Sequence, residues 1–361
     1  MIGATQPIQR PTNARLLVVD HNRRFDHVLR TALVEYLHPG DLVIANDAAT
    51  LPASLQGVHV ATGERIEVRL AGRPSLRPED VSWFSAVVFG AGDFHTRTED
   101  RLPPPRLTPG DQIIFGAPLE CDDSPHSNMP LRATIEKLLG HPRLVVLRFA
   151  GSADQVWAGL AHHGRPIQYA HVQQPLALWD VWTRIAGPPV AFEPPSAGFT
   201  LDWHVLANLR ERQIEFETIT HAAGISSTGD EELDGLLPLD EPYRIPEVTA
   251  RAIQRTKERG GQVVAVGTTV VRALEHAVTR DGRVRLGGVA TQRIGPSTRL
   301  HVVDAILSGT HERGTSHYEL LRAFLDDETL DRASKELDER NYLTHEFGDS
   351  VLIERPTTDG V

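Results

Sequence analysis

Short apolar runs that alternate with amphipathic helical segments constrain the fold of this chain more than any other feature. The runs predict buried strands at residues 14–20, 41–47, 214–222, 262–269, 299–307 and 350–355. Helical spacing of apolar residues predicts helices at residues 26–37, 201–213, 246–261, 270–278, 316–326 and 328–341. Because strands that alternate with helices build a mainly parallel or mixed sheet with flanking helices, an α/β fold is expected.

The stretch between residues 55 and 146 has a different texture. The segment GVHVATGERIEVRLAG at residues 57–72 alternates apolar and polar residues around a Thr-Gly turn, which is the pattern of a β-hairpin. Further short apolar runs follow it, separated by proline and glycine. This pattern predicts a small antiparallel β-barrel domain at 55–146, inserted into an α/β domain made of residues 1–54 and 147–361.

Charge and cysteine content narrow the functional classes. The chain has 361 residues and a formal net charge of −11, so it lacks an overall basic footprint for nucleic acid, although a local basic patch could still bind it. Cys121 is the only cysteine, which excludes a disulfide within the chain and is typical of a reducing compartment. Because no apolar run reaches the roughly 20 residues of a membrane span and no signal segment is present, a cytoplasmic protein without membrane contact is expected.

Polar residues follow four of the predicted strands at their carboxyl ends, where α/β sheets bind ligands. They are Asn46-Asp47, His221 with the Ala-Ala-Gly after it, Gly267-Thr268-Thr269, and Ser308 to His311. Each segment alone also fits an ordinary helix cap or turn, because these residue types are preferred there. The four together favour a binding cleft.

The turn after the strand at 262–269 has the chemistry of an anion site. Thr268 and Thr269 open a helix whose free N–H groups can bind a carboxylate, and Arg272 adds a planar cation one turn later. The alternative is that Arg272 pairs with Glu275 on a solvated helix face. The sequence leaves both interpretations open.

The loop PSAGF, which contains Ser196, Ala197 and Gly198, is a second candidate contact. Gly198 would let the backbone approach a ligand closely, but an ordinary helix entry explains the same residues equally well. The sequence has no HExxH or paired-cysteine pattern, so no metal is expected. It also has no dinucleotide fingerprint, P-loop or nucleophile elbow.

Several of these stretches resemble one known family. ARLLVVD, PGDLVIANDAATLPASL, GRPIQYAH, PSAGF, GGQVVAVGTTVVRALE, VVDAIL and FGDSVLIE follow one another in the order found in the S-adenosylmethionine:tRNA ribosyltransferase-isomerases of queuosine biosynthesis. The resemblance runs nearly end to end. It implies an α/β domain with a β-barrel insertion, in agreement with the pattern of the residues themselves.

The resemblance also implies a reaction. The ribosyl part of S-adenosylmethionine is transferred to 7-aminomethyl-7-deazaguanine in tRNA, and adenine and methionine are released. We expect His221, His311 and Asp47 to be catalytic. We expect Asn46, the loop Ser196–Gly198, the turn Gly267–Thr269 and Arg272 to bind S-adenosylmethionine, with Arg272 and the helix start at its carboxylate.

The chain departs from the family pattern at places in the expected cleft. Thr200 replaces a histidine after PSAGF, and GLLPLDEPY keeps only Glu241 of a His-x-Met-His-x-Glu element. Ser54 replaces a usual arginine. Two alternatives therefore stand beside the tRNA enzyme: a divergent relative that uses S-adenosylmethionine with a small-molecule amine or nucleoside acceptor, and a non-catalytic protein that binds nucleoside or tRNA.

Overall fold

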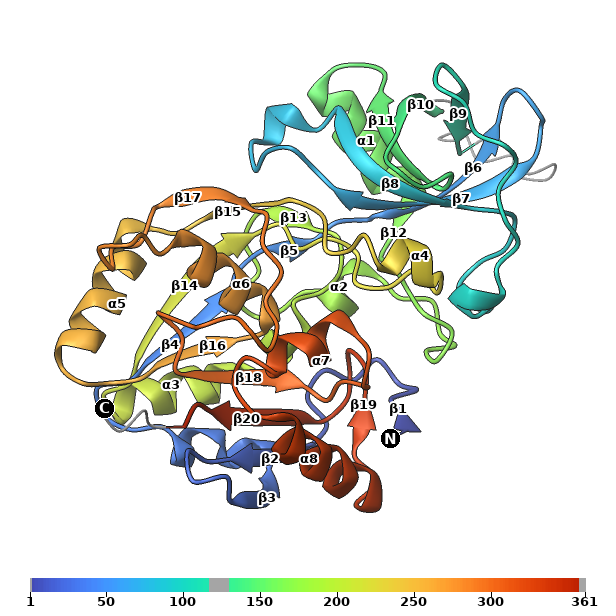
Figure 1. The fold of residues 1–361 in the computed structure, drawn as a ribbon. Coiled ribbons are helices and arrows are strands. Elements are labelled where there is room, and N and C mark those ends of the chain that lie inside the picture. The colour runs from blue at the N-terminus through green and yellow to red at the C-terminus, as the bar shows by residue number, and fades with distance from the viewer. Residues whose placement is uncertain (1, 117–129, 357–361) are drawn as a thin grey trace.

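The computed structural model describes residues 2–116 and 130–356, and Cys121 lies outside them. The largest sheet in the described residues has the strand order β17-β15-β14-β4-β16-β18-β20-β2-β3 (Figure 1). The bounds are β17 Gly287–Ala290, β15 Glu241–Arg244, β14 Glu215–His221, β4 Leu42–Asn46, β16 Val263–Val266, β18 Ala305–Gly309, β20 Ser350–Glu354, β2 Arg15–Val19 and β3 Phe25–Leu29. The strands β14, β4, β16 and β18 pair in parallel, while the pairs toward both edges include antiparallel ones. The expected mixed α/β sheet is confirmed.

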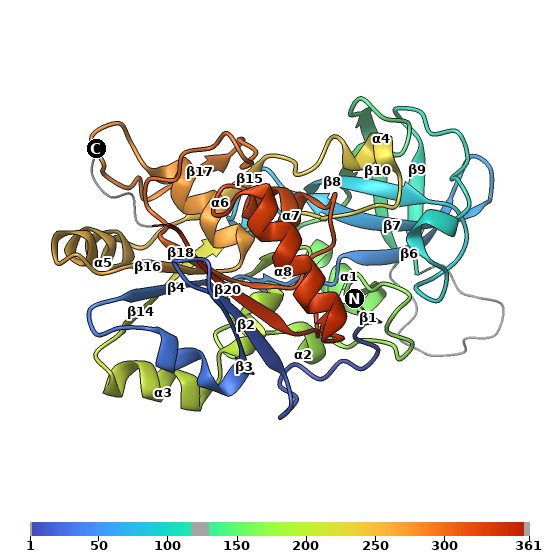
Figure 2. The same ribbon diagram turned by 60° about the horizontal axis from the view of Figure 1, so that its bottom comes forward.

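Helices cover both faces of this sheet (Figure 2). Along β4, Leu42 and Ile44 face one layer while Val43 and Ala45 face the other, as the period of two in a strand requires. The first layer contains α5 Glu247–Glu258, α6 Thr268–Ala277, α7 Ser316–Leu321 and α8 Asp327–Glu339. The second contains α3 Trp203–Glu211 and the 3-10 helices η1 Arg30–Tyr36 and η4 Ser196–Thr200.

The inserted domain is a closed antiparallel barrel, as expected (Figure 1). Pairing between its first strand, β6, and β9 closes the circle. The bounds are β6 Ser54–His59, β7 Arg65–Gly72, β8 Trp83–Phe89, β9 Gln112–Phe115, β10 Leu131–Leu138 and β11 Leu144–Phe149. The helix α1 Ala153–His163 packs on the barrel core through Val156 and Leu160, and β12 Gly164–Arg165 pairs with β6. The barrel elements therefore extend beyond both ends of the segment 55–146.

One expected helix is wrong, and the strand expected at 299–307 is shorter, since β18 begins at Ala305. A helix was expected over residues 26–37, but the chain forms the edge strand β3 and then the 3-10 helix η1. The carboxylate of Asp20 accepts the backbone N–H groups of Asn22 and Arg24, which closes a tight turn after β2. This turn brings Phe25 opposite Val19, so pairing with β2 overrides the helical spacing of the apolar residues.

The remaining elements of the described residues are short. They are β1 Ile2–Gly3, β5 Ala49–Thr50, α2 Leu178–Val181, β13 Pro189–Ala191, α4 Glu231–Asp234, β19 Leu343–Thr344, η2 Pro78–Asp80 and η3 Thr98–Asp100. Within the described residues, no helix is both long and apolar enough to cross a membrane.

Candidate functional site

A cavity of about 520 Å³ lies where the barrel-domain loop at η3 meets the α/β domain, a size typical of small-molecule sites. It opens beyond the carboxyl end of β18, where Gly309, Thr310 and His311 line it. We call it the interdomain cavity. Its other lining residues are Arg97, Thr98, Glu99, Tyr169, Ala170, His171, Glu193, Pro194, Ser196, Ser226, Ser227, Gly229, Glu312, Thr315, His317, Thr344, His345 and Glu346.

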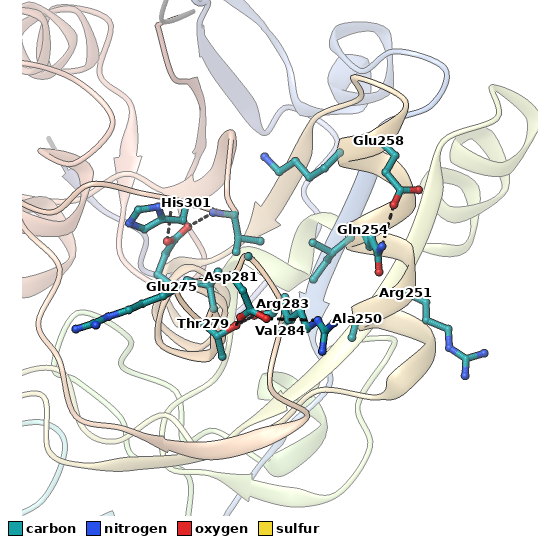
Figure 3. A pocket seen from close by; sticks show the side chains of 16 residues that line it. Ala250, Arg251, Gln254, Glu258, Glu275, Thr279, Asp281, Arg283, Val284 and His301 are labelled. Atoms are coloured by element: carbon teal, nitrogen blue, oxygen red, sulfur yellow. Dashed lines mark hydrogen bonds and ion pairs between the residues drawn. The ribbon is translucent and has the colours of Figure 1, made fainter.

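A larger hollow of about 1010 Å³ lies between α5 and the loop after α6 (Figure 3). Two pairs of its polar side chains bind each other: Gln254 donates to Glu258, and the hydroxyl of Thr279 donates to Asp281. Glu275 points to the backbone before β18 and accepts the N–H groups of residues 301–303. Because this hollow lies at the amino ends of the strands and holds mutually paired surface groups, the interdomain cavity is the better candidate.

Glu193 is the carboxyl group in the cavity with the most unusual environment. One of its oxygens accepts the hydroxyl of Tyr169, and the other accepts the backbone N–H of Ser226 at 3.1 Å. Burial raises the pKa of Glu193 to about 7, although these hydrogen bonds work against the shift. Burial and the adjacent Glu193 also raise the pKa of Tyr169 well above its usual value. Glu193 can therefore both give and take a proton near neutral pH.

Two stacked pairs of imidazole rings line other walls of the cavity. The ring centroids of His171 and His345 lie 4.2 Å apart, and those of His311 and His317 lie 4.7 Å apart. Burial lowers the pKa of His311 well below its usual value, and His317 and His345 lower it further. Nε2 of His311 lies 2.8 Å from Oγ of Ser308. His311 is therefore uncharged at neutral pH and is able to accept a proton.

Glu346 provides a fixed negative charge next to these rings. Its Oε2 lies 3.0 Å from Nε2 of His171. Burial alone would raise the pKa of Glu346, but the hydrogen bond and charge of His171 bring it below its usual value. Glu346 therefore stays ionised where Glu193 is poised to be protonated.

The structure brings only some of the expected site residues to the cavity. Ser196 and His311 line it. Ala197 and Gly198 are buried in η4, directly behind Ser196, and a Cβ on Gly267 would lie 3.5 Å from the Cβ of Ala197. The turn Gly267-Thr268-Thr269 thus supports the loop that carries Ser196, and none of its three residues lines the cavity.

Asn46 and Asp47 hold two strands together. The amide of Asn46 donates to the carbonyl of His221 and accepts its backbone N–H, both at 2.9 Å. The carboxylate of Asp47 accepts the hydroxyls of Thr220 and Thr218. These contacts fix β4 to β14, and neither Asn46 nor Asp47 lines the cavity.

Arg272 does not have the partner that the sequence suggested. Its guanidinium donates to the carboxylate of Glu241 and to the carbonyls of Gln292, Leu239 and Ala290. Glu275, the alternative partner, binds backbone N–H groups instead. The expectation that Arg272 binds a ligand carboxylate does not fit this arrangement, because the guanidinium is buried and its donors are in use.

His221 belongs to the same internal network. Its Nε2 lies 3.0 Å from Oε2 of Glu241, and the side chain is fully buried. It does not line the cavity. His221 therefore makes a structural contact with Glu241, and the catalytic role expected of it stays a prediction.

Sequence reasoning missed most of the cavity. Tyr169, His171, Glu193, His345 and Glu346 come from three distant segments. A signal was present for the first two, because they lie in the GRPIQYAH stretch that carries the family resemblance. Within residues 2–116 and 130–356, no group of three or more His, Cys, Asp or Glu side chains is placed to hold a metal ion.

Comparison with known proteins agrees with this architecture. The profile of a family described as "Queuosine biosynthesis protein" matches residues 2–353. The S-adenosylmethionine:tRNA ribosyltransferase-isomerase of Gloeobacter violaceus is 31% identical, over 97% of this chain and 92% of that relative. The protein of the same name from Thermosynechococcus vestitus is 28% identical over the same shares.

A solved structure shows the same fold. The crystal structure of S-adenosylmethionine tRNA ribosyltransferase from Thermotoga maritima matches with a TM-score of 0.50. The match covers 98% of this chain and 96% of that one, at 22% sequence identity.

Proposed function

Because this chain belongs to the family of queuosine biosynthesis proteins, we propose that it is an S-adenosylmethionine:tRNA ribosyltransferase-isomerase. It moves the ribosyl group of S-adenosylmethionine to 7-aminomethyl-7-deazaguanine in tRNA and releases adenine and methionine. The family match over nearly the whole chain is the observation that carries this proposal.

The charge of the interdomain cavity supports binding of a cationic donor. Its lining includes four glutamates, Glu99, Glu193, Glu312 and Glu346, of which Glu193 is ionised only in part near neutral pH. Arg97 is the only arginine or lysine among the described residues that line it, and this guanidinium pairs with Glu99. A sulfonium is attracted by such a site, whereas a phosphate group would be repelled.

The ionisable groups suit the first chemical step. A sulfonium acidifies the carbon next to it, so a modest base is able to remove a proton there. Neutral His311 and the ionised form of Glu193 are two such bases among the residues that line the cavity. Four histidines line the cavity, so the loss of a histidine at Thr200 does not deprive it of imidazole.

The names of the relatives favour this proposal over the two alternatives, which are an enzyme with a small-molecule acceptor and a non-catalytic binding protein. The relatives are named for tRNA, and nothing in their names supports a small-molecule acceptor. A non-catalytic role has no support from the relatives either, since each is named as an enzyme.

The test is release of adenine from S-adenosylmethionine. We expect release with tRNA that carries 7-aminomethyl-7-deazaguanine, and none with the same tRNA carrying unmodified guanine. Release with the free base alone would favour a small-molecule acceptor. Binding of the donor without release under any condition would favour the non-catalytic alternative.

A further inference from the structure

Three rings in the interdomain cavity lie nearly parallel to one another. The planes of Tyr169 and His171 differ by 9° with centroids 6.3 Å apart, and those of His171 and His345 differ by 16° with centroids 4.2 Å apart. All three residues line the cavity, and His345 is exposed. A flat ligand that binds against parallel rings stacks with its own plane parallel to theirs.

We propose that Tyr169, His171 and His345 form a stacking platform for the purine base of the donor, and that Glu193 is the catalytic acid that protonates this base as it leaves. The inference rests on the proposed function and names residues for one of its steps. The inference is argued from the contacts that the three rings and Glu193 make.

The platform is fixed from several sides. Glu346 holds the ring of His171 through Nε2. Gly3 packs so closely that a Cβ there would lie 3.0 Å from Cδ2 of His345. His345 itself has a φ of 70°, in the left-handed region that few residues other than glycine adopt. Such backbone strain persists where the surrounding structure holds it, and it concentrates at functional sites.

Glu193 lies at the edge of this platform, because the hydroxyl of Tyr169 binds its carboxyl group. A base that packs against the ring of Tyr169 would have this carboxyl group beside its edge. An acid is useful there, since adenine is a poor leaving group as an anion. Within the platform, the pKa of Tyr169 is raised and the pKa of His345 is lowered, so neither of these two side chains supplies a proton near neutral pH.

The step balances in atoms and electrons. The C1′–N9 bond breaks and its electron pair leaves with adenine, while the ring oxygen shares a lone pair with C1′. The Glu193 carboxyl proton moves to a ring nitrogen of adenine, which departs neutral. The carboxylate left behind keeps the hydrogen bonds from Tyr169 and from the N–H of Ser226, which stabilise its charge.

The groups around Glu193 set its protonation. The charge of Glu346 favours the protonated form of Glu193, and Arg69, which interacts with Glu193, lies 5.6 Å from the Tyr169 ring centroid. Arg69 is itself paired with Glu67. The carboxyl form therefore survives to about pH 7.

The test of the acid is the pH dependence of adenine release by Glu193→Gln. We expect kcat to fall by roughly 100-fold or more, while the affinity for S-adenosylhomocysteine is unchanged. Wild-type kcat should decline as pH rises through about 7, and this decline should be absent in the variant. Glu247→Gln, on the exposed face of α5, removes the same charge far from the cavity and should keep the decline. An unaltered kcat and pH profile in Glu193→Gln would overturn the assignment.

The test of the platform is His345→Asn, since asparagine tolerates the left-handed backbone and removes the ring. We expect S-adenosylhomocysteine to bind roughly 5- to 150-fold more weakly, as loss of base stacking predicts. Unchanged binding of this probe together with weakened tRNA binding would place the acceptor base on the rings and overturn the proposal. Failure of the proposed function looks different, because wild-type protein would then release no adenine at all.

Discussion

Oε2 of Glu241 lies 3.0 Å from Nε2 of His221, and both side chains are buried in the α/β domain. The same oxygen accepts an N–H of Arg272, and the other oxygen accepts the backbone N–H of Gly224 at 2.6 Å. Burial would raise the pKa of Glu241, but His221 and Arg272 bring it below its usual value. The carboxylate therefore joins β15 to β14 and α6 and holds the scaffold on which the cavity rests.

Removal of this carboxylate should destabilise the protein strongly. In Glu241→Ala, Arg272 keeps a buried charge without its partner, and we expect a loss of about 3–5 kcal/mol in the free energy of unfolding. Urea denaturation measures it. Glu247→Ala, which breaks an exposed pair with Arg251, is the control and should cost less than about 1 kcal/mol. Equal stability of the two variants would contradict the network.

Arg272→Ala separates the structural role of this arginine from the ligand-binding role first expected. Its guanidinium is engaged inside the chain, so the folded variant should bind S-adenosylhomocysteine as tightly as wild type while unfolding at lower urea concentration. Titration calorimetry below the unfolding transition gives the affinity. A large loss of affinity with normal stability would restore Arg272 as the partner of the donor carboxylate.

His311→Ala should lower turnover more than binding. His311 is neutral and faces the cavity, so it is placed to move a proton, and we expect kcat to fall by roughly 100-fold with little change in donor affinity. Ser308→Ala removes its 2.8 Å partner and should have a smaller effect in the same direction. An equal loss in kcat and in affinity would identify His311 as a contact residue only.

Stability should fall as the solution becomes mildly acidic. The pKa of both His311 and His317 is lowered by burial, so below the ordinary histidine pKa of about 6.5 the unfolded chain takes up protons that the folded chain does not. Glu193 opposes this trend, because its folded pKa of about 7 exceeds its unfolded value. Urea unfolding between about pH 7.5 and pH 5.5 gives the free energy of unfolding at each pH. This free energy should change less with pH in the double variant His311→Asn, His317→Asn than in wild type. The same pH dependence of the free energy of unfolding in both proteins would contradict the burial of these rings.

The fold followed from local patterns in the sequence. Strand and helix periods predicted the mixed sheet and the barrel, because burial on one or two faces dictates which positions are apolar. Residues 26–37 were the exception, since a turn at Asp20 and pairing with β2 decided their structure.

The site was less predictable, because its contacts span long distances along the chain. Arg272 found its carboxylate 31 residues upstream, at Glu241, although Glu275 lay at helical spacing. Glu193 acquired its chemistry from Tyr169, 24 residues away, and from burial that no local pattern encodes. His311 was found because it follows a strand at the carboxyl edge of the sheet, and Ser196 was found because it lies in the small-residue loop PSAGF.

A crystal structure of the protein with S-adenosylmethionine bound tests the location of the site most directly. We expect density for the adenine parallel to the rings of Tyr169 and His345, and the sulfonium in the interdomain cavity near Glu193 and His311. Density at the start of α6 beside Thr268, or in the hollow between α5 and α6, with the interdomain cavity empty, would contradict the account.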